Sequence, residues 1–233
     1  MRGRLASLSL ASALAAGAGG APATAAVPRS HELAVARAGQ TAMSRPSDTS
    51  RPVAWVNPRR PITEGATVLP VLGHSVSRDG RRWLRVRLPG RPNNATGWIR
   101  AARTTRALTR WHLVVDLSER RLTVYAGGVA VRAFPAIVGA AATPTPRGDA
   151  FVEETVSLRP RDAGAPYALA LSSRSYVLQE FAGGPGQIAI HGVRNIGGVL
   201  GTAASHGCVR LATDAVTWLG ERIGPGVPVT VSA

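Results

Sequence analysis

Residues 204–211 read Ala-Ser-His-Gly-Cys-Val-Arg-Leu, and they contain Cys208, the only cysteine of the 233-residue chain. A single cysteine is most often a small buried apolar side chain, and with no second thiol it forms no intramolecular disulfide. For catalysis it must become a thiolate, and a free thiol titrates near pH ~8.5. Two histidines are candidates for the group that takes its proton: His206 in the same stretch and His191 further upstream.

The residues around these histidines indicate how a site could be built. His191 follows the apolar segment 187–190, which predicts a buried strand that delivers the imidazole from a rigid element. A thiolate–imidazolium pair would then activate the sulfur. Gly207 leaves the backbone beside Cys208 uncrowded, so the amides of these two residues are candidate donors to an oxyanion. The glycine-rich segment 197–202 is flexible enough to bring the two parts together.

The first 25 residues have the pattern of a secretory signal peptide. Arg2 and Arg4 precede an uncharged stretch at 5–18, and Ala-Thr-Ala at 23–25 offers a cleavage site. The apolar stretch is shorter than the about 20 residues of a membrane span, so we expect no stable span after cleavage. Export to the cell envelope follows, where an unpaired thiol is exposed to oxidation and its retention favours catalysis.

The net charge of +15 predicts an anionic partner. All 28 basic residues are arginine, they are scattered along the chain, and aromatic residues make up 5% of it. Nucleic acid is therefore not expected for an exported protein, and anionic cell-wall polymers fit better.

The chain before residue 111 is predicted to be a linker followed by a small β unit. Residues 26–50 lack apolar periodicity and indicate a flexible linker. Between 51 and 105, strands are expected at 67–73, 83–88 and 97–99. The Trp-Leu-Arg-Val and Gly-Trp-Ile sequences of the last two resemble bacterial SH3-like modules found beside cell-wall enzymes. Such a module is either a spacer or a wall-binding unit.

Residues 111–232 form a larger predicted domain. Alternating patterns predict strands at 112–117, 121–125 and 129–134, and a Gly-Gly turn joins the last two. A helix is expected over 213–223 with Thr213 as its N-cap. A final strand at 227–231 contains Pro228, which favours an edge position. The fold class is mainly β with one short C-terminal helix.

The C-terminal half resembles the L,D-transpeptidase (YkuD-type) catalytic domain, which implies a β-sandwich or barrel-like fold. The resemblance is carried by His191-Gly192 and by Ser-His-Gly-Cys-Val-Arg at 205–210. A Thr-Pro-x-Gly-x-Phe signature is matched at 144–148, with Phe151 one place late. The resemblance extends from about residue 111 to 231.

The resemblance implies a role for each matching residue. Cys208 would attack the third residue of a peptidoglycan tetrapeptide stem and form a thioester, His191 would be the base, and the Gly192 carbonyl would orient its ring. An amine from a second stem would complete a cross-link without a cofactor. Gly207, Ser205 and His206 would support the site, although His206 is also an alternative base.

Two further residues are candidates for substrate binding. Arg210 could bind a substrate carboxylate or brace its loop through backbone carbonyls. Tyr176 lies in a stretch that could cover the site, where structural packing is the alternative role. His191, His206 and Cys208 are also an acceptable zinc set, but no carboxylate-bearing motif accompanies them and the resembled family implies no metal.

Three functions compete on these observations. The first is an exported L,D-transpeptidase of cell-wall biogenesis, the second an L,D-carboxypeptidase that uses water as acceptor, and the third a wall-binding protein with an inactive catalytic fold. A papain-like protease is disfavoured because its cysteine precedes its histidine in the chain. Acylation by a carbapenem, which the resemblance implies, would separate the first two functions from the third.

Overall fold

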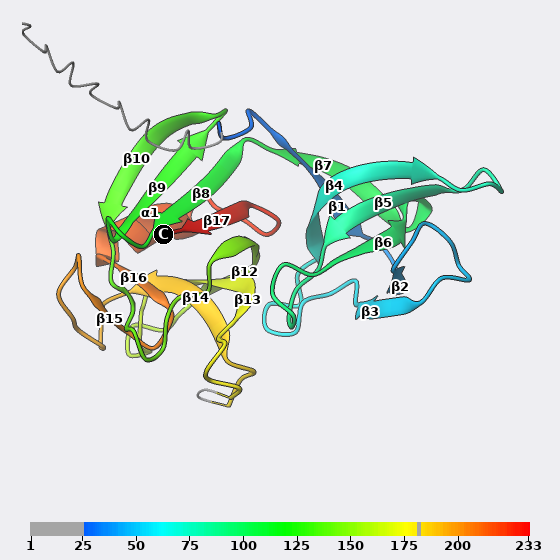
Figure 1. Cartoon of the computed structure of the whole chain (residues 1–233). Helices are drawn as coiled ribbons and strands as arrows, with labels where there is room; N and C mark the ends of the chain where they lie inside the picture. Colours follow the sequence, from blue (N-terminus) through cyan, green and yellow to red (C-terminus); the bar gives the residue numbers. More distant parts are fainter. Residues whose placement is uncertain (1–25, 181–182) are drawn as a thin grey trace, which may run out of the picture.

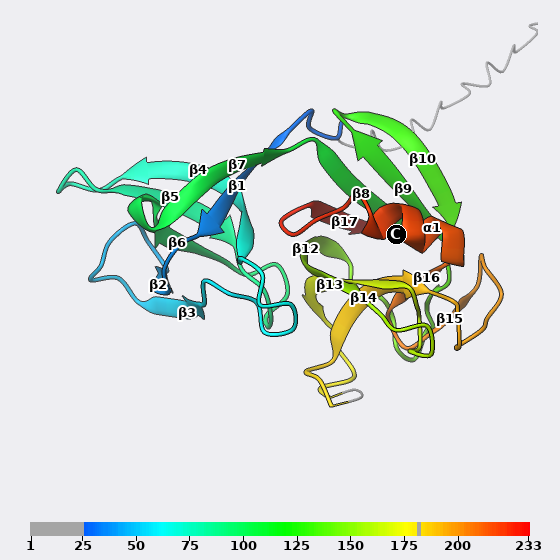
Figure 2. The same ribbon diagram turned by 180° about the vertical axis from the view of Figure 1, so that it is seen from behind.

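The computed structural model describes residues 26–180 and 183–233. Two β-rich units follow one another along the chain and lie side by side (Figures 1 and 2). The predicted fold class, mainly β with one short C-terminal helix, is confirmed. The predicted signal peptide lies outside the described residues. No helix of the described part of the chain has the length and apolar character that crossing a bilayer requires.

The N-terminal unit is a seven-stranded antiparallel sheet in the order β3-β2-β6-β5-β4-β1-β7. Its core consists of apolar side chains such as Leu69, Val86 and Ile99, none of which is exposed. Its resemblance to SH3-like modules stays a prediction. Its elements are β1 (His31–Ala36), β2 (Gln40–Met43), β3 (Pro52–Val56), β4 (Val68–Val76), β5 (Arg82–Arg87), β6 (Thr96–Arg100), the 3-10 turn Ala101–Arg103 and β7 (Thr104–Thr109).

The predicted flexible linker at 26–50 is wrong, because β1 and β2 lie within it. β1 pairs with both β4 and β7, and it buries Leu33, Ala34 and Ala36. Small alanine side chains give a weak apolar pattern, and the strand is held by partners that follow it much later in the chain. Local composition therefore concealed it, and the unit begins at His31 rather than at residue 51.

The C-terminal unit contains an eight-stranded sheet in the order β10-β9-β8-β17-β12-β13-β14-β16 and a two-stranded sheet of β11 and β15. Strands and the Gly127-Gly128 turn, with both φ angles positive, lie where the pattern predicted them. The elements are β8 (Trp111–Asp116), β9 (Arg121–Ala126), β10 (Val129–Pro135), β11 (Val138–Gly139), β12 (Gly148–Ser157), β13 (Tyr167–Arg174), β14 (Gln187–Gly192), β15 (Ala203–Ser205), β16 (Val209–Leu211), α1 (Thr213–Gly220) and β17 (Pro228–Ser232).

Two details at the C-terminus differ from the predictions. Thr213 is the first helical residue rather than the N-cap, which is Ala212 without a side-chain bond, and α1 ends at Gly220. The strand β17 is not at an edge, because it lies between β8 and β12. Pro228 is tolerated there as the first residue of the strand, a position where a missing N–H costs little.

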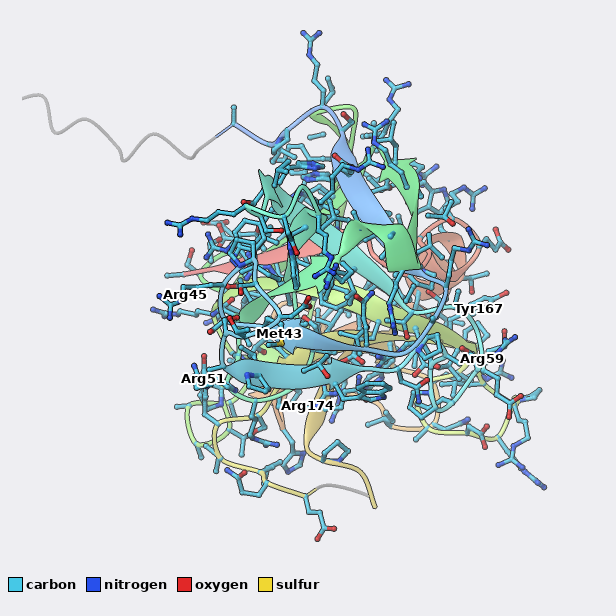
Figure 3. All side chains as sticks on the ribbon, turned by 90° about the vertical axis from the view of Figure 1, so that its right-hand side faces the viewer. Met43, Arg45, Arg51, Arg59, Tyr167 and Arg174 are labelled. Atoms are coloured by element: carbon cyan, nitrogen blue, oxygen red, sulfur yellow. The ribbon has the colours of Figure 1, made fainter. Side chains whose placement is uncertain are left out.

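The two units share buried residues. Phe151 on β12 is 1% exposed and packs into the core of the N-terminal unit rather than that of its own sheet. Two positions further along β12, Glu153 forms ion pairs with Arg174 of the same unit and with Arg60 of the N-terminal unit. Arg174 is labelled in Figure 3, which views the molecule from the right-hand side of Figure 1. The C-terminal unit is thus packed and ion-paired against the module that precedes it.

Candidate active site

Cys208 lies directly before β16, at the point where this strand begins to pair in parallel with β14. The register aligns Val209 with Ile190 and Arg210 with His191. Residues 187, 189 and 191 alternate with buried Ile188 and Ile190 along β14, so His191 lies on the less buried face of this strand.

Cys208 and His191 line one pocket of about 430 Å³. The structure therefore brings together the nucleophile and the more distant of the two candidate bases. His206, which is exposed, and Arg210 also line this pocket. Its other lining residues come from four segments: Ala163, Ser175, Leu178, Gly186, Gln187, Ile188 and Ile196.

The His191 ring is oriented by a backbone carbonyl. Its Nδ1 lies 2.9 Å from the Gly192 carbonyl oxygen. A carbonyl only accepts, so Nδ1 carries the proton in the neutral ring and Nε2 keeps its lone pair. The Gly192 amide donates in turn to the Gly164 carbonyl at 2.8 Å. A Cβ at residue 192 would lie 2.6 Å from the Ala165 oxygen, so only glycine fits there.

Gly164 is a site residue that the sequence did not reveal. It has a φ of +86°, and a Cβ at this position would lie 2.5 Å from His191 Nδ1. The backbone of Gly164 therefore lies directly against the imidazole. No sequence motif marks it, because it is separated from His191 along the chain and the contact arises only in the folded domain.

Ser205 and Gly207 form the turn that presents Cys208. The buried Ser205 hydroxyl donates to the Cys208 carbonyl at 2.5 Å and accepts from the Gly207 amide at 3.2 Å. Ser205 is thus a support, as expected. The Gly207 amide, expected as an oxyanion donor, is instead bonded to Ser205. Gly207 has a φ of +112°, a conformation that favours glycine.

The upstream segment 139–145 supports this turn from behind. The Thr145 hydroxyl donates to the Gly207 carbonyl at 2.8 Å and accepts from the Gly139 amide at 2.9 Å. The Thr143 hydroxyl donates to the Ser205 carbonyl at 3.1 Å. The signature at 144–148 therefore has a physical role, since its Thr145 holds the backbone at Gly207, while Thr143 just before the signature holds the backbone at Ser205.

The two predicted substrate-binding residues are placed differently. Arg210 lines the pocket, and its Nε is buried without a hydrogen-bond partner among the described residues. Tyr176 is 58% exposed and lines a neighbouring hollow with Arg91 and Gln179 rather than the pocket of Cys208. The structure thus brings Arg210, but not Tyr176, to the candidate nucleophile.

Burial in the pocket favours the uncharged forms of the Cys208 thiol and the His191 imidazole. Burial raises the pKa of the Cys208 thiol, although the Ala189 N–H and the Arg210 charge oppose this shift. Burial lowers the pKa of His191; the bond to the Gly192 carbonyl opposes this shift and the Arg210 charge adds to it. Both directions favour a neutral thiol beside a neutral imidazole, in contrast to the thiolate–imidazolium pair expected from the sequence.

Metal binding has no support from the arrangement of ligands. Within residues 26–180 and 183–233, no group of three or more His, Cys, Asp or Glu side chains is placed to hold a metal ion.

Comparison with known proteins gives a consistent assignment. Residues 110–231 match the family model of the L,D-transpeptidase catalytic domain, YkuD. A Bacillus subtilis (strain 168) protein described as an L,D-transpeptidase YkuD is 28% identical over 125 residues, and the Bacillus licheniformis protein of that description is 29% identical over 124. Each match covers 52% of this chain and 66% of the relative, just under two thirds of its length.

Solved structures with a similar arrangement include two mycobacterial proteins. An L,D-transpeptidase from Mycobacterium tuberculosis H37Rv aligns with a TM-score of 0.46 and 17% identity, over 72% of this chain and 90% of that one. An L,D-transpeptidase from Mycobacterium smegmatis aligns with a TM-score of 0.40 and 20% identity, over 65% and 90%.

Proposed function

This chain belongs to the L,D-transpeptidase (YkuD) family, whose catalytic-domain model covers more than half of it, and on that premise we propose that it cross-links peptidoglycan stem peptides in the cell envelope. The observation that carries the proposal is the single pocket in which Cys208 and His191 meet. The substrate of the first step is a tetrapeptide stem, and the reaction exchanges one amide bond for another.

The first half-reaction forms a thioester on Cys208. As the sulfur attacks the carbonyl carbon of the third stem residue, Nε2 of His191 takes the thiol proton. The tetrahedral intermediate then expels the terminal D-alanine, whose nitrogen receives that proton from the imidazolium. The Gly192 carbonyl, bonded to Nδ1, stabilises the transient imidazolium in place of the carboxylate of a conventional triad.

The second half-reaction reverses these proton transfers. An amine from a neighbouring stem attacks the thioester carbonyl and gives its proton to His191, and Cys208 leaves as a thiol. The Cys208 amide is the candidate donor to the oxyanion in both halves, because the Gly207 amide is bonded to Ser205. The unpartnered Nε of Arg210 is suited to a carboxylate of the substrate.

Anionic wall polymers are the proposed second partner. The net charge of +15 supports this role, as do exposed arginines of the N-terminal unit such as Arg45, Arg51 and Arg59 (Figure 3). We also propose that the protein is exported through the N-terminal signal pattern.

Retention on isolated cell walls should weaken steeply with salt, since exposed charges are screened over about 10 Å at 0.1 M.

The activity is tested by incubating the purified protein with a stem tetrapeptide and measuring released D-alanine. A product with the mass of a cross-linked dimer supports transpeptidation, whereas a trimmed monomer assigns L,D-carboxypeptidase activity instead. Absence of both products, together with no carbapenem adduct on Cys208 by mass spectrometry, would leave the wall-binding function.

Substitution of Gly164 by alanine is expected to lower kcat/KM by about tenfold or more, because displaced catalytic groups lose near-attack geometry. The added Cβ would collide with His191 Nδ1 and turn the ring away from the Gly192 carbonyl. Gly80→Ala is the matched control, since Gly80 has a similar positive φ but no atom within 4 Å of the place its Cβ would occupy. Equal losses in the two variants would show that backbone strain, not the imidazole contact, is responsible.

The pH dependence of kcat/KM should have its acidic limb below pH 6.5, the ordinary pKa of histidine. Burial lowers the pKa of His191, so the neutral base persists as the pH falls and is lost only below that value. Initial rates measured between about pH 4 and 9 check this expectation. An acidic limb centred at or above pH 6.5 contradicts it.

A further inference from the structure

One side of the catalytic pocket is formed mostly by backbone that belongs to no strand or helix. We define the pocket wall as residues 175–178, which follow β13, and residues 186–187, which lead into β14. The wall includes Ser175, Leu178, Gly186 and Gln187 of the pocket lining. Most of this wall lacks the ladder of hydrogen bonds that fixes a strand. Its conformation must therefore be determined by other contacts.

The wall is folded tightly upon itself. The Ser175 amide donates to the Gly186 carbonyl at 2.8 Å, and the Ser175 hydroxyl accepts from the amides of Val177 and Leu178. A Cβ on Gly186 would collide with the Leu178 oxygen. These bonds do not use the carbonyls of Ser175 and Leu178, which accept from the N-terminal unit instead.

A loop of the N-terminal unit binds those carbonyls. This loop, which we call the clamp loop, comprises residues 88–95 between β5 and β6 and contains Arg91. The Arg91 guanidinium donates to the carbonyls of Ser175 at 2.9 Å, Leu178 at 3.1 Å and Pro185 at 2.9 Å. Bonds from a charged donor are stronger than neutral ones, and the planar fork of arginine fixes the positions of several acceptors together.

The clamp loop also bonds to the end of β13, next to the wall. The Asn93 side-chain amide donates to the Arg174 carbonyl and accepts from the Arg174 amide, both at 2.8 Å. The Gly90 amide donates to the Ser172 carbonyl at 2.9 Å. The last residues of β13 are therefore bonded to the N-terminal unit just before the chain enters the pocket wall.

A buried ion cluster joins the same region from behind. Glu153, which is 1% exposed, accepts from Arg174 at 2.9 Å and from Gln187 of the wall at 3.3 Å. Its other oxygen is paired with Arg60 of the N-terminal unit. Both ends of the wall are thus connected to the preceding module through charged or bidentate bonds.

We propose that Arg91 and Asn93 of the N-terminal unit are positioning residues for the reaction of the C-terminal unit: they hold the pocket wall in the conformation that binds the donor stem peptide. The inference rests on the proposed function for its substrate. It assigns the N-terminal unit a part in shaping the active site, in addition to any spacing or wall-binding role.

Arg91→Ala is expected to raise KM for the stem tetrapeptide by about tenfold while kcat changes far less. The reason is that the displaced wall would contact the bound substrate, whereas Cys208 and His191 would keep their positions. Arg78→Ala, which removes the same charge from an exposed turn between β4 and β5, should leave both constants unchanged. Arg91→Lys should give an intermediate KM, since one ammonium group does not span three carbonyls in a fixed fork.

Hydrogen exchange tests the inference without reliance on turnover. Amides of residues 175–178 should exchange faster in Arg91→Ala and in Asn93→Ala than in the wild type or in Arg78→Ala, while those of β12 stay unchanged. Unaltered exchange in the wall overturns the inference. So does an Arg91→Ala variant whose KM is unaltered and whose only change is a smaller fraction of protein with a titratable Cys208. If the wild type releases no D-alanine, the proposed function fails. The exchange result still shows whether Arg91 and Asn93 of the clamp loop hold the pocket wall in place.

Discussion

Replacement of Cys208 by alanine is expected to reduce D-alanine release from a stem tetrapeptide by a factor on the order of 10⁴ or more, since no other group of the pocket can form the covalent intermediate. Ser175 also lines the pocket, but its hydroxyl accepts from the amides of Val177 and Leu178. The Ser205 hydroxyl is likewise engaged, with the Cys208 carbonyl and the Gly207 amide. The rate of release under saturating substrate is the measurement.

The same variant separates a chemical effect from a structural one. Alanine is only one heavy atom smaller than cysteine and Cys208 is a partly exposed residue, so the midpoint of thermal unfolding should change little. Cys208→Ser adds a conservative comparison, in which a poorer nucleophile replaces the sulfur at the same position. D-alanine release by Cys208→Ala at the wild-type rate would exclude the thioester mechanism.

Replacement of His191 by alanine is expected to lower kcat by about 10²- to 10⁴-fold, the usual contribution of a positioned general base. The neutral thiol of the unliganded site must lose its proton during the attack, and Nε2 of His191 is the lone pair that the Gly192 bond leaves available. Burst kinetics of thioester formation would show directly whether acylation is the slowed step.

His206 provides the matched comparison, because it lines the same pocket and stands two positions from the cysteine. His206→Gln should lose less than about tenfold of kcat, as expected for a supporting residue. A loss in His206→Gln as large as that in His191→Ala would exchange the roles of the two histidines.

The arrangement also explains how a site without a carboxylate partner can orient its base. A carbonyl oxygen holds the tautomer of His191 without adding a negative charge to the pocket. Burial therefore remains the main cause of the lowered pKa of His191, and the bond to the Gly192 carbonyl opposes this shift without reversing it. The glycine at residue 192 is required because a side chain would collide with the Ala165 oxygen.

Several elements of the fold were predictable because their signals are local. The alternating strands that became β8, β9 and β10, the Gly127-Gly128 turn and the apolar face of α1 were predicted from periods of 2 and 3.6 residues. The strands β1 and β17 were misjudged for the opposite reason. Each is held between two strands that are distant in the chain, and such pairing leaves little trace in local composition.

The sequence by itself determined the family and the candidate catalytic groups: one cysteine in a Ser-His-Gly-Cys motif and a His-Gly pair upstream. The tertiary structure decided which groups surround them. Parallel pairing of β14 with β16 brings Cys208 to His191, the fold places Gly164 against the imidazole, and a loop of the preceding module carries Arg91 to the pocket wall. Motifs record residues that act as neighbours along the chain, whereas these contacts depend on register and docking between distant segments.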